Sequence, residues 1–293
     1  MDKIINLGIP HVGEQILNSI GTDELLQFQK VSVAWKILIE NVLFRRWKGE
    51  VLLACETRQA EILKVLFERS DLGIIDFNAK NAHEETGLIL ACINGHVEVV
   101  KLFLDHSSRT QIDFNHKDDS DWFSGGKTAF MWACVNGHMD IVKLLLEHSG
   151  NKGIDFDVKD DFNENALSYA SEKGHASVVK ILLEYSNSKK IDVNASSSIA
   201  GKTAFIYACR RGHNDVVKAF LDYSGSNQID FNAKDNHGTT AFMYACEIGH
   251  VDIVELILDY SIKHQIYLNA KDDMGWTALI CRIRTSFKTV FEN

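Results

Sequence analysis

The fold is decided by a phrase found in Thr203-Ala204-Phe205-Ile206-Tyr207-Ala208-Cys209-Arg210-Arg211-Gly212-His213, which returns along most of the chain. Its closing Gly-His pair stands five times, at Gly95, Gly137, Gly174, Gly212 and Gly249, in steps of 42, 37, 38 and 37 residues. Self-similarity at a nearly fixed period predicts a stack of repeated units instead of one globular core. Because such stacks usually present binding surfaces, the period also favours a binding role over a catalytic one.

One unit can be followed from Ile229 to Ser261. It opens with a short extended piece, residues 229–232, and continues in a polar turn, residues 233–238, whose Asn, Asp and Gly tolerate tight turns. Thr240 then begins a helix, and Gly249-His250 ends it. A second helix over residues 251–258 is apolar on all but one narrow face. Since neither helix is amphipathic by itself, each needs a neighbouring unit on both sides.

These residues resemble the ankyrin repeat. The family phrase T-P-L-H-x-A-A-x-x-G-H-x-x-V-V-x-x-L-L is matched by residues 203–213, followed by Val216-Val217 and Phe220-Leu221. The resemblance covers the chain from about residue 50 to the end and implies an all-α solenoid. Alanine or glycine replaces the family proline, and the histidine of the first helix is apolar or serine. Because both departures remove groups that join adjacent turns, we expect fewer hydrogen bonds between turns.

The ends of the repeat region depart from the phrase, as the ends of a solenoid commonly do. Residues 50–72 hold a partial first unit without Gly-His, and the last unit starts well at Gly275 but also lacks that pair. We therefore expect an ankyrin solenoid of about seven units over residues 49–293, five of them full. Each unit should be a pair of antiparallel helices, with little sheet beyond short turn hairpins.

Composition narrows the partners and the compartment. Hydrophobic residues make up 45% of the 293 residues, and the formal net charge is -9. An acidic chain without a basic stripe argues against nucleic acid and against anionic membranes. No apolar run approaches the roughly 18 residues of a spanning helix, and the first residues do not resemble a signal peptide. We therefore expect an intracellular protein, in the cytoplasm or the nucleus.

Cysteine and histidine recur at fixed places of the unit. Equivalent positions in stacked helices lie about 10 Å apart, whereas a disulfide needs Cα atoms within about 7 Å and zinc holds its ligands at about 2 Å. We therefore expect free thiols that are buried as small side chains at a tight helix contact. We also expect a structural role for the five histidines instead of a metal site. No catalytic constellation comes together, so we expect neither an enzyme nor a cofactor. The cysteines that follow an alanine at one repeat position are Cys55, Cys92, Cys134, Cys209 and Cys246.

Residues 1–48 do not follow the repeat and predict three short helices. The order of their apolar residues resembles an F-box, most clearly in the phrase Val31-Ser32-x-x-Trp35-Lys36. F-boxes dock on the Skp adaptor of cullin-RING ubiquitin ligases, so the resemblance implies a Skp-family adaptor and its cullin complex as partners. It also implies a docking face formed or supported by Pro10, Ile16, Leu17, Ile20, Leu25, Leu26, Val31, Leu43 and Phe44.

A second interpretation makes residues 1–48 only a helical cap over the apolar end of the stack. Caps are a physical need of solenoids. A cap requires one apolar face, however, whereas this segment is apolar on several faces and holds two tryptophans. Because excess apolar surface marks a partner site, the segment favours the F-box-like interpretation.

The substrate side is expected on the first helices and on one enlarged turn. The series Trp132, Tyr169, Tyr207 and Tyr244 occupies one helix position and either lines the concave face or forms a packed ladder. The next two positions vary between units, and the ankyrin resemblance implies that they belong to the recognition surface. The enlarged turn carries two aromatics, which form a binding finger or fold onto their own repeat. The candidates for substrate binding are Trp122, Phe123, Val135, Asn136, Glu172, Lys173, Arg210, Arg211 and Glu247.

Together these features predict a non-enzymatic adaptor. Residues 1–48 would bind the ligase core and the repeats would bind a protein substrate. The runner-up is an ankyrin scaffold without a ligase role. On the repeats, we expect Glu172, Lys173, Arg210, Arg211 and Glu247 to be at least half exposed, with the two arginines forming a basic spot. The alternative is that each arginine pairs with an acid of a neighbouring unit.

Overall fold

The computed structural model describes residues 46–68, 70, 75–119, 125–148, 150, 153–223 and 228–283 of the chain. The chain divides into two compact units, Met1–Asp113 and Phe114–Asn293. Both are helical where they are described, and β structure there is confined to isolated bridges across the turns, such as Lys234 with Thr240. The expectation of helices with little sheet is confirmed.

Each repeat contributes a short first helix and a second helix that returns beside it. The first helices are α6 (Gly87–Ile93), α8 (Ala129–Val135), α10 (Ala166–Lys173), α12 (Ala204–Arg211) and α14 (Ala241–Ile248). The second helices are α5 (Ala60–Glu68), α7 (Val97–Thr110), α9 (Met139–His148), α11 (Ala176–Lys189), α13 (Asn214–Leu221) and α15 (Val251–Ser261). Residues 46–56 and 278–283 are also helical, so the described residues hold six helix pairs and the beginning of a seventh.

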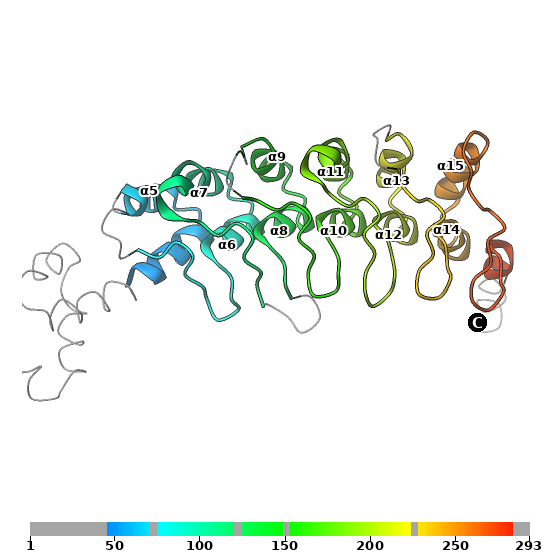
Figure 1. Ribbon diagram of the computed structural model, residues 1–293, viewed down its shortest axis with the longest axis horizontal. Helices are drawn as coiled ribbons and strands as arrows, with labels where there is room; N and C mark the ends of the chain where they lie inside the picture. The colour runs from blue at the N-terminus through cyan, green and yellow to red at the C-terminus, as the bar shows by residue number, and fades with distance from the viewer. Residues whose placement is uncertain are drawn as a thin grey trace, which may run out of the picture. The chain divides into compact units, whose positions relative to one another are not determined.

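In the second unit, the first helices form one row and the second helices form another (Figure 1). In one row α10 packs between α8 and α12, and α12 packs against α14. In the other row α11 packs between α9 and α13, and α13 packs against α15. The two rows bury apolar side chains against each other, and the ring centroids of Phe205 and Phe220 lie 5.7 Å apart. The core is therefore a continuous layer between the rows.

The first helices begin at a residue whose side chain caps the helix. Thr203 Oγ1 accepts a hydrogen bond from the backbone N–H of Ile206 over 3.4 Å, and Thr240 Oγ1 accepts from Met243 over 3.3 Å. Thr86 and Thr128 cap α6 and α8 in the same way. Caps of this kind stabilise a helix by about 1 kcal/mol. The predicted start of the first helix at Thr240 is confirmed.

The Gly-His pair has two separate structural roles. Gly174 ends α10 in the left-handed region, at φ 82°, and a Cβ there would come within 2.7 Å of the His213 ring. His213 belongs to the next repeat, and its Nε2 donates to the Glu172 carbonyl over 2.8 Å. His175 donates to the Val135 carbonyl over 2.9 Å in the same way. The histidine thus ties a repeat to the one before it, which supports its structural interpretation.

In the first unit, the same link uses a residue other than glycine. His96 Nε2 donates to the Glu56 carbonyl over 2.9 Å, and Arg58, two residues after that carbonyl, is left-handed at φ 60°. The core centres on Phe67, whose ring stacks on Phe77 at 4.0 Å and meets Phe103 edge-on at 5.4 Å. The partial first repeat therefore keeps the link of the full repeats although it lacks Gly-His.

Asparagines join successive turns. Asn194 Nδ2 donates to the Gln228 carbonyl over 2.8 Å, and Asn194 Oδ1 accepts from the Asp230 N–H over 2.9 Å. The same pair of bonds to the following turn is made by Asn78, Asn115 and Asn232. The sequence predicts fewer hydrogen bonds between turns than the family phrase would give, and these asparagines supply two at each of four steps.

One position of the asparagine series is an aspartate, and a second substitution accompanies it. Asp157 Oδ1 accepts from the Asp192 N–H over 2.9 Å, but a carboxylate has no N–H to donate. Asn165 stands where the other repeats have threonine, and its Nδ2 donates to Asp157 Oδ1 over 2.8 Å and to the Asp192 carbonyl over 2.9 Å. Its Oδ1 still caps α10 by accepting from the Ser168 N–H. The helix cap and the link between turns are therefore coupled at Asn165.

All six cysteines are free thiols. Cys92, Cys134 and Cys209 are fully buried, and burial raises the pKa of the Cys92 and Cys209 thiols above its usual range. Cys246 is only half-buried, contrary to the prediction that it is buried. The reason is an open apolar pocket of about 410 Å³, which Cys246 lines together with Leu258 and Leu279.

Residues 1–48, called the F-box-like segment after the resemblance of their sequence, lie almost wholly outside the described residues. All of its expected adaptor contacts do so: Pro10, Ile16, Leu17, Ile20, Leu25, Leu26, Val31, Leu43 and Phe44. Trp47, one of its two tryptophans, is described and is 1% exposed. It belongs to the helical residues 46–56, which run through the boundary expected after residue 48.

Candidate functional site

In the second unit, the aromatic residues of the first helices meet the base of the turns. Tyr169 Oη donates to Asp160 Oδ2, and Tyr244 Oη donates to Asp235 Oδ2 over 2.6 Å. The other oxygen of Asp160 accepts two backbone N–H groups of its own turn, one of them from Glu164 over 2.8 Å. Tyr169 is 8% exposed. Tyr207 is buried to the same extent, whereas Trp132 and Tyr244 are half-buried. The aromatic series is therefore a hydrogen-bonded ladder that also faces a solvent-open pocket, so it combines the two alternatives that the sequence left open.

The residue before a first-helix cap reaches the aromatic ring of the next repeat. Lys127 Nζ lies 4.7 Å from the centroid of the Tyr169 ring. Lys202 Nζ lies 5.6 Å from the centroid of the Tyr244 ring and 3.4 Å from Asp235 Oδ2. Burial alone would raise the pKa of Asp235, but bonds from Tyr244 and two turn N–H groups, together with Lys202, lower it below its usual value. The lysine thus helps to stabilise a buried carboxylate.

In the repeat between those of Lys127 and Lys202, the residue before the helix cap is Glu164. Glu164 Oε1 accepts a hydrogen bond from the Tyr207 hydroxyl. Burial raises the pKa of Glu164, and the carboxylates of Asp160 and Glu172 add to the rise, which outweighs the lowering by bonds from the neighbouring tyrosines. The turn residue that corresponds to Asp235 is Ser197, which is neutral. This step therefore buries a carboxylate whose charged form is disfavoured.

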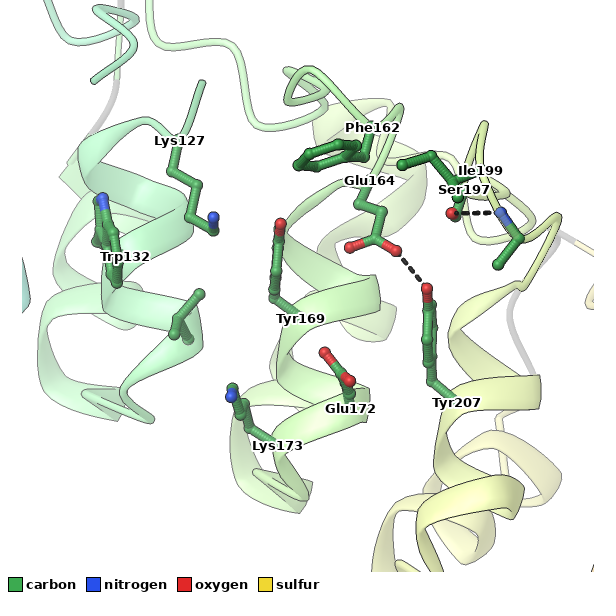
Figure 2. A pocket seen from close by; sticks show the side chains of 12 residues that line it. Lys127, Trp132, Phe162, Glu164, Tyr169, Glu172, Lys173, Ser197, Ile199 and Tyr207 are labelled. Atoms are coloured by element: carbon green, nitrogen blue, oxygen red, sulfur yellow. Dashed lines mark hydrogen bonds between the residues drawn. The ribbon is translucent and has the colours of Figure 1, made fainter. Parts of the chain in front are cut away.

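Glu164 lines a pocket of about 460 Å³ that opens to solvent beside α8, α10 and α12. Figure 2 shows its carboxylate between the hydroxyl groups of Tyr169 and Tyr207, with Phe162 above. Ile199, also in the lining, is 68% exposed. The pocket thus combines aromatic rings, an exposed apolar edge and a carboxylate. Its remaining lining includes Lys127, Trp132, Val135, Glu172, Lys173, Ser197 and Ala200.

The predicted substrate-binding residues on the first helices are less exposed than expected. The exposed ones are Asn136, Lys173 and Arg211, whereas Val135, Glu172, Arg210 and Glu247 are half-buried. The prediction that Glu172, Arg210 and Glu247 are at least half exposed is therefore wrong. Contacts between repeats cover part of this surface, because Arg211 pairs with Glu172 of the preceding repeat. Arg210 lies with its guanidinium carbon 5.8 Å from the centroid of the Tyr244 ring. The Arg211 contact agrees with the alternative of charge pairs within the stack, whereas the contact found for Arg210 is with an aromatic ring.

Only part of the predicted surface contributes to the pocket. Val135, Glu172 and Lys173 line it, while Trp122 and Phe123 lie outside the described residues. Glu164 was not among the residues predicted from the sequence, because those candidates lie near the end of the first helix. A signal was available, since the residue before the cap changes from Lys127 to Glu164 to Lys202 in consecutive repeats.

A family model for ankyrin repeats matches the chain in three copies, over residues 51–160, 152–235 and 227–292. The chain belongs to the ankyrin-repeat family. Among solved structures, this ankyrin chain is similar to the ankyrin repeat domain of Bcl-3, described as a unique member of the IkappaB protein family. The TM-score is 0.66 and the sequence identity 19%, over 79% of this chain and 92% of that chain, which shows a shared fold. No curated protein matches the chain.

Membership of the ankyrin-repeat family implies a role in protein–protein interaction, and no catalytic family is indicated. Within the described part of the ankyrin chain, no group of three or more His, Cys, Asp or Glu residues could hold a metal ion. Of the helices described, none is long and apolar enough to cross a membrane. The family match begins at residue 51 and does not extend into the F-box-like segment.

Proposed function

We propose that the chain is a substrate-recognition adaptor of a Skp–cullin–F-box ubiquitin ligase. The ankyrin repeats would hold a protein substrate on the face that carries the first helices, here called the first-helix face. The pocket at Glu164 is the observation that carries this binding role, since it places aromatic and carboxylate groups at solvent on that face. The F-box-like phrase at residues 31–36 supports the second half of the proposal, docking on a Skp-family adaptor.

A second candidate is an ankyrin scaffold in which residues 1–48 only cap the stack. One observation favours it. Leu53, Ile62 and Val65 are 54%, 43% and 46% exposed in the first helix pair. This is apolar surface of the kind that a terminal cap would bury. The two candidates share the interaction role of the repeats and differ in whether residues 1–48 bind a second protein.

Affinity capture with the full chain separates the candidates. The ligase adaptor should retain a Skp-family protein and a cullin, and Leu25→Ala with Leu26→Ala should weaken that capture without lowering the melting temperature of the repeats. Each leucine lost from an interface costs about 1–3 kcal/mol. Leu279→Ala is the matched control, since it shortens a leucine that is 69% exposed in the last described helical turn, outside both the segment and the surface that a cap would bury.

The outcomes are distinct. A parent chain that retains no Skp-family protein refutes the ligase half of the proposal. A lower melting temperature in the double variant, with no Skp-family protein captured by either chain, supports the cap instead.

A further inference from the structure

The repeats of this chain contain their own examples of how an ammonium group is held. Lys127, which is 2% exposed, lies with Nζ 5.3 Å from the Trp132 ring centroid and 4.7 Å from that of Tyr169. Lys202, two repeats further along the chain, combines the Tyr244 ring with the Asp235 carboxylate. A cation is attracted to the face of an aromatic ring, and more strongly where water is excluded. The chain therefore builds an ammonium site from a tyrosine and a carboxylate.

The repeat between those of Lys127 and Lys202 also combines a tyrosine ring with a carboxylate. Here the carboxylate belongs to the residue before the helix cap. Tyr207 corresponds to Tyr169 and Tyr244, and the carboxylate is that of Glu164. Glu164 stands directly before its helix cap, as Lys127 and Lys202 do in the repeats on either side, so an acid lies here between two lysines. In this repeat the chain therefore supplies a carboxylate, and not an ammonium group, beside the Tyr207 ring.

The surroundings of Glu164 suit a lysine side chain. Phe162, Tyr169 and Tyr207 can cover its four-carbon stem, and the pocket of about 460 Å³ leaves room for it. The carboxylates of Asp160 and Glu172 both act on Glu164 and raise its pKa, and Arg211 already pairs with Glu172. Two lysines also line the pocket: Lys127 is held by its own rings, and Lys173 is exposed.

We propose that the pocket takes a lysine side chain of a protein partner, with the ammonium group at the Glu164 carboxylate and the stem between Tyr169 and Tyr207. This rests on the proposed interaction role of the first-helix face, and it names the chemical feature that the face recognises. The bound lysine supplies an ammonium group beside a tyrosine ring, as Lys127 and Lys202 do in the repeats on either side. Removing the positive charge of the bound lysine removes the recognition, because the uncharged stem has no group that can pair with the Glu164 carboxylate.

The test is a titration of the full chain with the peptide Gly-Ala-Lys-Ala-Gly, followed through the methyl resonance of Ile199 and the ring resonances of Tyr207. A matched peptide with norleucine in place of lysine keeps the stem and lacks the ammonium. We expect saturable shifts with the lysine peptide, and binding weaker by about tenfold or more with the norleucine peptide.

Two variants with the same charge change complete the design. Glu164→Lys introduces the lysine that the repeats on either side carry at this position. It should abolish the shifts while leaving the melting temperature at or above that of the parent chain. Glu184→Lys changes an exposed residue of α11 outside the pocket and should bind the lysine peptide like the parent chain. Equal binding of both peptides, or unchanged binding in Glu164→Lys, overturns the proposal. If affinity capture still yields a protein partner that Glu164→Lys does not release, the interaction role stands and the lysine site is wrong.

Discussion

The coupling of Asn165 to Asp157 can be measured as an energy. Asn165→Thr keeps an oxygen to cap α10, but it removes the two bonds that Nδ2 donates to Asp157 Oδ1 and the Asp192 carbonyl. A bond to an ionised group contributes about 1.5–3 kcal/mol and a neutral one about 0.5–1.5 kcal/mol. Because neighbouring groups relax, we expect a loss near the lower end of the sum, about 2 kcal/mol in the free energy of unfolding.

The same change should cost much less after Asp157→Asn. An asparagine at that position has its own N–H groups and can link to the following turn, as Asn194 does. We therefore expect Asn165→Thr to cost only about 0.5 kcal/mol in that background, so that the coupling energy is about 1.5 kcal/mol. Urea denaturation of the parent chain, both single variants and the double variant gives this energy directly.

A mirror experiment in another repeat provides the control. Asn232 and Thr240 stand at the same separation along the chain as Asp157 and Asn165. Asn232→Asp should therefore destabilise the stack by removing the donor to the Gln265 carbonyl, and Thr240→Asn should restore part of the loss. Additive effects within about 0.3 kcal/mol in the first cycle would refute the coupling.

The remaining predictions concern charge, backbone and thiols. Glu164→Gln should be increasingly stabilising as the pH rises from about 4 to 7. The pKa of Glu164 is raised, so stability that is present below the ordinary glutamate pKa is lost as the buried carboxyl ionises. A difference in the free energy of unfolding between variant and parent chain that does not change with pH would contradict this. Gly212→Ala should lower the free energy of unfolding by about 1–3 kcal/mol, since φ is 80° and a Cβ would meet the His250 ring at 2.6 Å; chemical denaturation measures it, and an unchanged midpoint would count against the assigned role of glycine. A thiol reagent should label half-buried Cys246 well before buried Cys209 in the native chain, as mass spectrometry of the labelled peptides can follow, and equal rates would be inconsistent with the burial of Cys209.

Periodicity made the fold predictable from the sequence. A Gly-His phrase repeated at a nearly constant step fixes where the first helix ends, and a threonine at a constant distance before it fixes where that helix begins. The predicted unit, with helices from Thr240 and after His250, agrees with α14 and α15. Local signals sufficed because each element is set by residues close to it in the chain.

The candidate site could be predicted only in part, because its contacts join different repeats. Glu164 and Tyr207 are 43 residues apart, and Arg211 and Glu172 are 39 apart. A position that looks free within one unit, such as Arg211, can be paired with the unit before it. Exposure on the first helices was overestimated for this reason. Glu164 was missed because only a comparison of consecutive repeats shows an acid between two lysines at this position.

The histidine link has a direction, from each repeat back to the one before it, and this bears on how such a chain can change in evolution. Loss of a terminal repeat uncovers either a backbone carbonyl or an imidazole, and water can satisfy both. Whole repeats can therefore be duplicated or deleted at the ends without orphaning a buried polar group. The Glu164 pocket follows a different rule, since its lining comes from three consecutive repeats. A new repeat inserted between them would abolish the pocket while leaving every repeat intact. The pocket therefore persists in evolution only where the order of these repeats is kept.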